Sequence, residues 1–196
     1  MIGINMKSVL ISIRPQWCEK IASGKKTIEV RKTAPKEVPF KAYIYCSKEK
    51  KQDDIIWAGA FGDRGKWNGH VIGEFICDEV EEFHEWELSP QGKFVDFERE
   101  RLENFLTAAC LSEEEVVRYR ENLPYFKPLY GWHISNLKIY DKPKELSEFR
   151  PICKFEGKDA ICALFCPNWK YDGGLFFECT RKVTRPPQSY MFVEEV

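Results

Sequence analysis

The first part of the chain places a strand, a short helix and a second strand in close succession. The segment K-S-V-L-I-S-I-R, from Lys7 to Arg14, is rich in β-branched residues, and Pro15 follows it directly. Proline suits the first turn of a helix and Gly24 suits its end, so only a short helix fits between them. The alternating T-I-E-V-R segment then predicts a second strand over 26–32.

The remaining sequence predicts further strands, but strands and helices do not alternate regularly. A capping box of Ser112 and Glu115 indicates that the helical part, about 97–123, contains two helices. Gly73, inside a predicted strand, indicates a bulge or a close backbone approach. The irregular order favours an α+β fold built on a small, mostly antiparallel barrel over a doubly wound sheet. Further strands are expected at 41–47, 71–80 and 130–140 and in the second half of 185–194.

Composition limits the classes of function. The hydrophobic fraction of 43% can fill a core, so a folded protein is expected, and 196 residues suffice for one domain. No apolar run is long enough to span a bilayer and the first residues do not resemble a signal peptide, so the predicted location is cytoplasmic. A net charge of −1 argues against a histone-like, non-specific duplex binder.

The second strand carries an unusual set of charges. Strand alternation places Glu29 and Arg31 on one face, with Lys25 and Lys26 at the preceding turn. A carboxylate accepts amino or imino hydrogens and a guanidinium binds phosphate or carbonyl oxygens, so the pair could hold a nucleotide. An ordinary ion pair on a solvated strand explains the same residues equally well.

These residues carry a resemblance to a known family. The stretch S-V-L-I-S-I-R-P-Q-W-C-E-K-I-A-S-G-K-K-T-I-E-V-R-K is similar to ASCH domains of the PUA-like superfamily, whose signature is G-x-K-x-x-E-x-R. Gly24, Lys26, Glu29 and Arg31 meet that signature. The later H-I-S-N-L-K-I-Y-D-K-P-K-E-L-S-E-F and R-P-P-Q-S-Y-M-F-V resemble long bacterial and phage-encoded members. Residues 48–70 and the helical insert have no counterpart in this resemblance.

The resemblance implies a PUA-like mixed β-barrel with a cleft beside the signature. It also implies binding of RNA, a nucleotide or a modified nucleoside. The expected binding residues are Lys25, Lys26, Glu29 and Arg31, with Trp17 stacking a base and Arg14 contacting a phosphate. Single-stranded RNA or an exposed modified base suits such a cleft better than a duplex does.

The same resemblance leaves an enzymatic alternative. One branch of the family is an amidohydrolase acting on N4-acetylcytidine, with a catalytic lysine and threonine, and some members are reported as ribonucleases. The lysine corresponds to Lys26, but Glu29 occupies the place of the threonine. A carboxylate attacking an amide carbon would form a mixed anhydride, so Glu29 would instead act as a general base towards water while Lys26 stabilises an oxyanion. A protein-binding module, docking through 48–70 or the acidic insert, is a third hypothesis.

The cysteines divide into two groups. Cys18, Cys46, Cys77 and Cys110 fall in predicted strands or helices and are expected to be core thiols. Cys153, Cys162, Cys166 and Cys179 fall in a loop-rich appendage, about 150–182, where four thiolates could bind a structural zinc ion. Buried thiols are the alternative for this group too.

Overall fold

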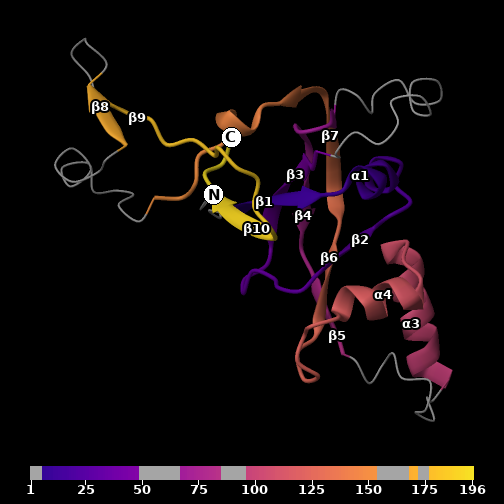
Figure 1. Ribbon diagram of the computed structural model, residues 1–196. Coiled ribbons are helices and arrows are strands. Elements are labelled where there is room, and N and C mark those ends of the chain that lie inside the picture. Colours follow the sequence, from indigo (N-terminus) through magenta and orange to yellow (C-terminus); the bar gives the residue numbers. More distant parts are fainter. Residues whose placement is uncertain (1–5, 49–66, 85–95, 154–167, 172–176) are drawn as a thin grey trace, which may run out of the picture.

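The computed structural model describes residues 6–48, 67–84, 96–153, 168–171 and 177–196 (Figure 1). Its centre is a five-stranded sheet in the order β10-β1-β3-β4-β7. Strands β1 and β3 are parallel, and every other pair in this sheet is antiparallel. The strands are β1 (Lys7–Ile13), β3 (Phe40–Cys46), β4 (Val71–Cys77), β7 (Ser135–Lys144) and β10 (Tyr190–Val193).

A second sheet contains β2 (Ile28–Arg31), β6 (Leu129–His133) and β5 (Val80–Phe83), in the order β2-β6-β5. Two segments expected as single strands each contribute to both sheets. The segment 71–80 divides into β4 and the start of β5, and the segment 130–140 divides into β6 and β7. At the second division Ile134 donates its backbone N–H to the Thr27 carbonyl, 2.9 Å away, where the chain changes sheets.

The structure supports a mixed α+β fold, but the described strands do not close into the expected barrel. They pair as two separate sheets, and β7 lies at an edge of the larger one. The pairing of β4 with β7 is interrupted near Gly73, as the sequence predicts. A Cβ atom on Gly73 would lie 2.4 Å from the Lys138 carbonyl oxygen, so only glycine permits this approach.

In the described ranges, three α-helices accompany the sheets: α1 (Pro15–Ala22), α3 (Asp96–Ala109) and α4 (Glu113–Arg120). Helix α4 begins with the predicted capping box, in which the Glu115 N–H donates to Ser112 Oγ and the Ser112 N–H donates to the Glu115 carboxylate. Among the described residues, no helix is both long and apolar enough to cross a membrane. A short 3-10 helix, η2 (Leu146–Glu148), and the paired strands β8 (Trp169–Tyr171) and β9 (Phe177–Cys179) complete the described elements.

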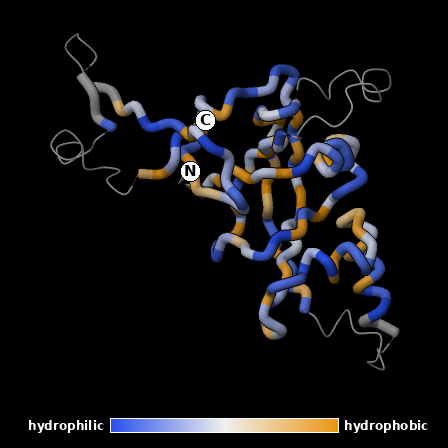
Figure 2. The backbone as a smooth tube through the Cα atoms, viewed as in Figure 1, coloured by the Kyte–Doolittle hydropathy of each residue, from blue (hydrophilic) through white to orange (hydrophobic). Residues whose placement is uncertain are grey.

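Two hydrophobic clusters support the candidate site. The larger sheet packs around Trp132, which is fully buried with its ring centroid 5.0 Å from that of Phe40. The smaller sheet packs Ile28 and Val30 against the predicted apolar stripe of α3, including Phe105. Figure 2 shows that hydrophobic residues concentrate in the central strands, whereas the peripheral connections are mostly hydrophilic. Because Ile28 and Val30 face α3, the alternate residues Glu29 and Arg31 face the other way.

Candidate functional site

A cavity of about 480 Å³ borders the face of β2 that carries Glu29 and Arg31. Helix α1, the end of β1 and helix α4 form its walls, and Gln188 from the segment before β10 also lines it. The volume lies within the range of small-molecule sites in proteins. Its lining residues are Ser12, Ile13, Arg14, Gln16, Trp17, Lys26, Glu29, Val30, Arg31, Leu111, Glu115, Arg118, Tyr119 and Gln188.

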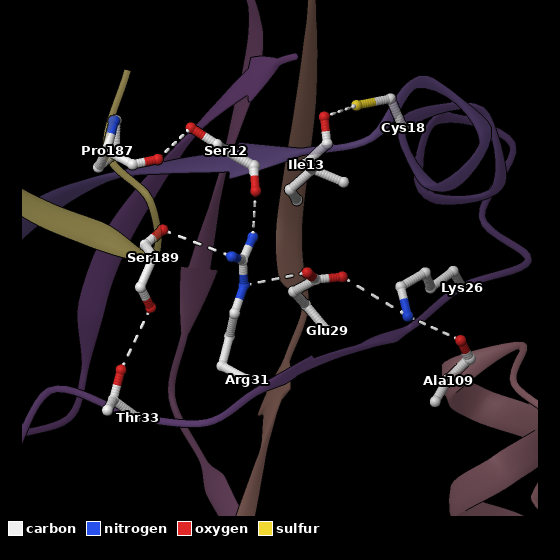
Figure 3. A network of polar contacts seen from close by, with 10 residues as sticks. All are labelled: Ser12, Ile13, Cys18, Lys26, Glu29, Arg31, Thr33, Ala109, Pro187 and Ser189. Carbon is white, nitrogen blue, oxygen red and sulfur yellow. Dashed lines mark hydrogen bonds and ion pairs between the residues drawn. The ribbon is translucent and has the colours of Figure 1, made fainter. Parts of the chain in front are cut away.

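Three charged side chains of the signature segment meet at this cavity. The Glu29 carboxylate lies between two cations, with Oε1 3.1 Å from Arg31 Nε and Oε2 3.5 Å from Lys26 Nζ (Figure 3). All three residues are buried, with exposed fractions of 3% for Lys26 and 6% each for Glu29 and Arg31. The alternation of the strand is therefore confirmed, but the pair is not solvated. We call Lys26, Glu29 and Arg31 the buried triad.

Backbone oxygens from distant segments fix the ends of the buried triad. Arg31 donates from Nη2 to the Ser12 carbonyl at 2.6 Å and from Nη1 to the Ser189 carbonyl at 3.4 Å. Lys26 donates to the Ala109 carbonyl at 2.7 Å (Figure 3). The guanidinium therefore joins β2 to β1 and to the C-terminal segment, and the ammonium joins it to α3.

The buried triad carries a net charge of +1 when all three groups are ionised. Burial lowers the pKa of Lys26 below the ordinary lysine value, although the nearby Glu29 carboxylate opposes this change. The buried triad thus has one carboxylate for two buried cations. An anion entering the cavity would supply the missing negative charge.

The residues predicted from the first helix lie at the wall of the cavity. Trp17 is half-buried and lines the cavity, and the ammonium groups of Lys20 and Lys26 lie 4.5 Å and 5.2 Å from its ring centroid. Arg14 is exposed and also lines it. Lys25 is not among the lining residues: its side chain is exposed, and its carbonyl accepts a bond from Cys110 Sγ.

Helix α4 supplies lining residues that the sequence alone did not identify as part of a site. Glu115, Arg118 and Tyr119 border the cavity, together with Leu111, which precedes the helix. Burial raises the pKa of the Tyr119 hydroxyl, while the positive charges of Arg31 and Arg14 act to lower it, so this hydroxyl lies among the charges of the site. The sequence placed Tyr119 on a helix, but contained no signal for where that helix docks.

The helical insert is attached directly to the signature segment. Besides the bond from Lys26, Thr27 donates its N–H to the Ala108 carbonyl at 2.8 Å. Lys20 Nζ lies 3.4 Å from the Cys110 carbonyl, and Cys110 Sγ donates to the Lys25 carbonyl at 3.2 Å. The last turn of α3 therefore forms part of the support of the cavity floor.

The predicted zinc site lies partly outside the described residues, because Cys162 and Cys166 are not described. Cys153 and Cys179 are half-buried. Burial acts to raise the pKa of Cys179, but the Arg181 guanidinium, with Nε 2.9 Å from Sγ, holds it below the ordinary cysteine value. In the part of the chain that the structure describes, no group of three or more metal-ligating side chains is found. Zinc remains a prediction, which metal analysis of the purified protein would test.

Three of the other four cysteines lie in the core, as expected, and so does Trp132. Cys18, Cys46 and Cys77 are buried, and Cys110 is half-buried at the end of α3. Trp132 is fully buried and cannot stack a ligand base. His133 lies at a second cavity, of about 440 Å³, with its Nε2 atom 3.6 Å from the Glu81 carboxylate.

Comparisons with known proteins give structural neighbours. No family model matches the chain, and no curated protein matches it. Among solved structures, the chain is similar to an ASCH protein from Zymomonas mobilis, with a TM-score of 0.46 and 18% identity over 96% of this chain and 89% of that one. A single-site variant of that protein gives a TM-score of 0.47 and 17% identity, over 96% of this chain and 91% of the variant. The N-terminal domain of Staphylothermus marinus McrB gives a TM-score of 0.39 and 11% identity, over 81% of each chain.

Proposed function

We propose that this protein binds nucleotides or single-stranded RNA, and that one nucleotide occupies the cavity beside Gly24–Arg31. The observation that carries the proposal is the position of the buried triad, which places a carboxylate between two cations at the floor of a cavity of about 480 Å³. Buried charges in a concave site are typical of ligand-binding sites. The resemblance of this segment to the ASCH signature supports the same proposal.

The buried triad retains hydrogen-bonding capacity for a ligand. Within the described residues, Arg31 donates hydrogen bonds to the Ser12 and Ser189 carbonyls, and its Nε, paired with Glu29 by charge at 3.1 Å, has no hydrogen-bond partner; a guanidinium has five N–H groups. Each Glu29 oxygen faces one cation and keeps a further lone pair. A nucleobase presents both donors and acceptors at its edges, so it matches a site that combines these groups.

The form of the cavity favours an unpaired base over a duplex. A base can enter a pocket of this size only when it is unstacked, and its faces are then available to aromatic side chains. Trp17, half-buried at the wall, presents such a surface. Stacking on Trp17 and hydrogen bonding to the buried triad would together hold one base.

A binding experiment with a Trp17→Ala variant tests this proposal. Affinity for a fluorescent single-stranded RNA of about 10 nucleotides would be measured by anisotropy, and loss of base stacking is expected to weaken it roughly five-fold or more. Tyr125→Ala is the matched control, because Tyr125 is 63% exposed and does not line the cavity. Urea unfolding would establish that both variants are folded. Absence of RNA and nucleotide binding by the wild-type protein, or equal affinities of the two variants, would refute the proposal.

A second candidate, hydrolysis of acylated nucleosides or RNA, is favoured by the lowered pKa of Lys26 at the cavity floor. In that mechanism Glu29 would take a proton from water and Lys26 would stabilise the oxyanion. Both Glu29 oxygens already face cations, so a water molecule would have to approach a carboxylate that is paired on both sides. Incubation with acylated nucleosides and RNAs would test it: a product that Lys26→Met abolishes is expected of an enzyme, and no product from the wild type excludes these substrates.

A further inference from the structure

Helix α4 presents a polar face to the cavity. Glu115, Arg118 and Tyr119 follow helical spacing and line the cavity together, whereas Val116 and Arg120 are buried inside the insert. The insert thus contributes more than support, because its second helix forms a wall of the site.

Two of the lining arginines differ from the other arginines near the site. Arg31 and Arg120 are buried and donate to backbone carbonyls. Arg14 and Arg118 are exposed, and neither guanidinium has a hydrogen bond or ion pair with any described residue in the structure. Both therefore keep their N–H groups available at the margin of a cavity whose floor already carries excess positive charge.

Arg14 and Arg118 approach the cavity from different elements. Arg14 is the N-cap residue of α1, and Arg118 lies in the last turn of α4. Figure 1 shows these helices on opposite sides of the start of β2, which carries the floor of the cavity. A ligand seated in the cavity would therefore be bordered by guanidinium groups from both of these elements.

We propose that Arg14 and Arg118 bind the two phosphates that flank the nucleotide in the cavity. The ligand is accordingly a nucleotide within a strand, or a bisphosphate, rather than a nucleoside. Guanidinium groups suit this role because they bind phosphate oxygens in a bidentate manner. The inference rests on the proposed function, and adds to it the ligand's charge and a role for the helical insert.

The salt dependence of binding measures the phosphate contacts. For a single strand, each neutralised phosphate contributes about −0.7 to the slope of log affinity against log salt. Removing one of the two contacts is therefore expected to make this slope shallower by about 0.7. A structural role for either arginine would change the stability of the protein but not this slope.

The experiment measures the slope with the same RNA of about 10 nucleotides for the wild type, Arg14→Ala and Arg118→Ala. Arg99→Ala is the control, because Arg99 lies on α3 outside the cavity and pairs with Glu103 on the surface. We expect a shallower slope and weaker binding for the first two variants and no change for the control. Arg118→Lys, which keeps the charge, is expected to keep the slope.

Competition against the labelled RNA identifies the ligand class. A nucleoside 3′,5′-bisphosphate is expected to compete better than the 5′-monophosphate, and the monophosphate better than the nucleoside. Equal competition by all three, or unchanged slopes in both alanine variants, would overturn the inference; if Trp17→Ala still weakens RNA binding, the proposed function survives. Failure of the wild type to bind RNA or any of these nucleotides would refute both.

Discussion

Replacing Glu29 by glutamine should destabilise the protein strongly, although the two side chains have nearly the same size. The substitution leaves Lys26 and Arg31 buried side by side, 3% and 6% exposed, without the carboxylate that lies between them. Removing one member of a buried ion pair typically costs about 3–5 kcal/mol. For a domain of this length that corresponds to a decrease in melting temperature of roughly 6–20 °C.

Urea unfolding at neutral pH would measure the change in the free energy of unfolding. Glu103→Gln is the control, because its ion pair with Arg99 is exposed at the surface of α3 and is expected to contribute no more than about 0.5 kcal/mol. The double variant Lys26→Met, Glu29→Gln removes one of the two cations as well. It should lose less stability than the sum of the single changes, by about 1–3 kcal/mol. Equal effects of Glu29→Gln and Glu103→Gln, or additive losses in the double variant, would refute the idea of a coupled buried triad.

Three further predictions concern other parts of the site and its support. RNA affinity should fall as the pH rises from neutral towards the ordinary lysine pKa, because burial lowers the pKa of Lys26 in the free protein and the negative charge of a nucleotide in the cavity raises it, so binding takes up a proton in that window. Ser112→Ala should lower the free energy of unfolding by about 1 kcal/mol, because it removes the cap of α4. Gly131→Ala should cost about 1–3 kcal/mol, because the new Cβ would lie 2.6 Å from Phe105 Cε2 and 2.9 Å from Ile28 Cγ2.

Two of these predictions have a control variant, and the third has an outcome that would refute it. For the pH dependence of RNA affinity the control is Lys26→Arg, whose guanidinium does not titrate. An equally steep decrease in the affinity of this variant would assign the effect to another group. For Ser112→Ala the control is Ser147→Ala, at an exposed serine of η2. Equal losses of unfolding free energy in the two variants would contradict the capping argument. Unchanged urea unfolding of Gly131→Ala would show that the contact of β6 with α3 is not close.

Local sequence patterns predicted the elements around the site well. The proline and glycine that bound α1, the capping box of α4 and the alternation of β2 all depend on neighbouring residues, and the structure confirms each of them. Gly73 also marks a close approach, as its position in a strand indicated. These features need no knowledge of the tertiary fold.

The sequence could not predict features that depend on contacts between distant segments. The strand-like pattern of 130–140 does not reveal that the chain passes from one sheet to the other at Ile134, between β6 and β7. The burial of Glu29 and Arg31 depends on carbonyls at Ser12 and Ser189, and on α4 covering the cavity. Alternation alone therefore left a ligand-binding pair and a solvated ion pair as equal alternatives, whereas the fold buries the pair beside a cavity.

The positions around the cavity are of two kinds, because backbone carbonyls hold the buried triad in place but do not hold every lining residue. Arg31 and Lys26 are committed to holding the tertiary structure, so they tolerate little change whatever ligand is present. Gln16 and Gln188 border the same cavity, yet they are exposed and take no part in that framework. Evolution or directed selection could therefore alter ligand preference through these two glutamines while the scaffold beneath them stays intact.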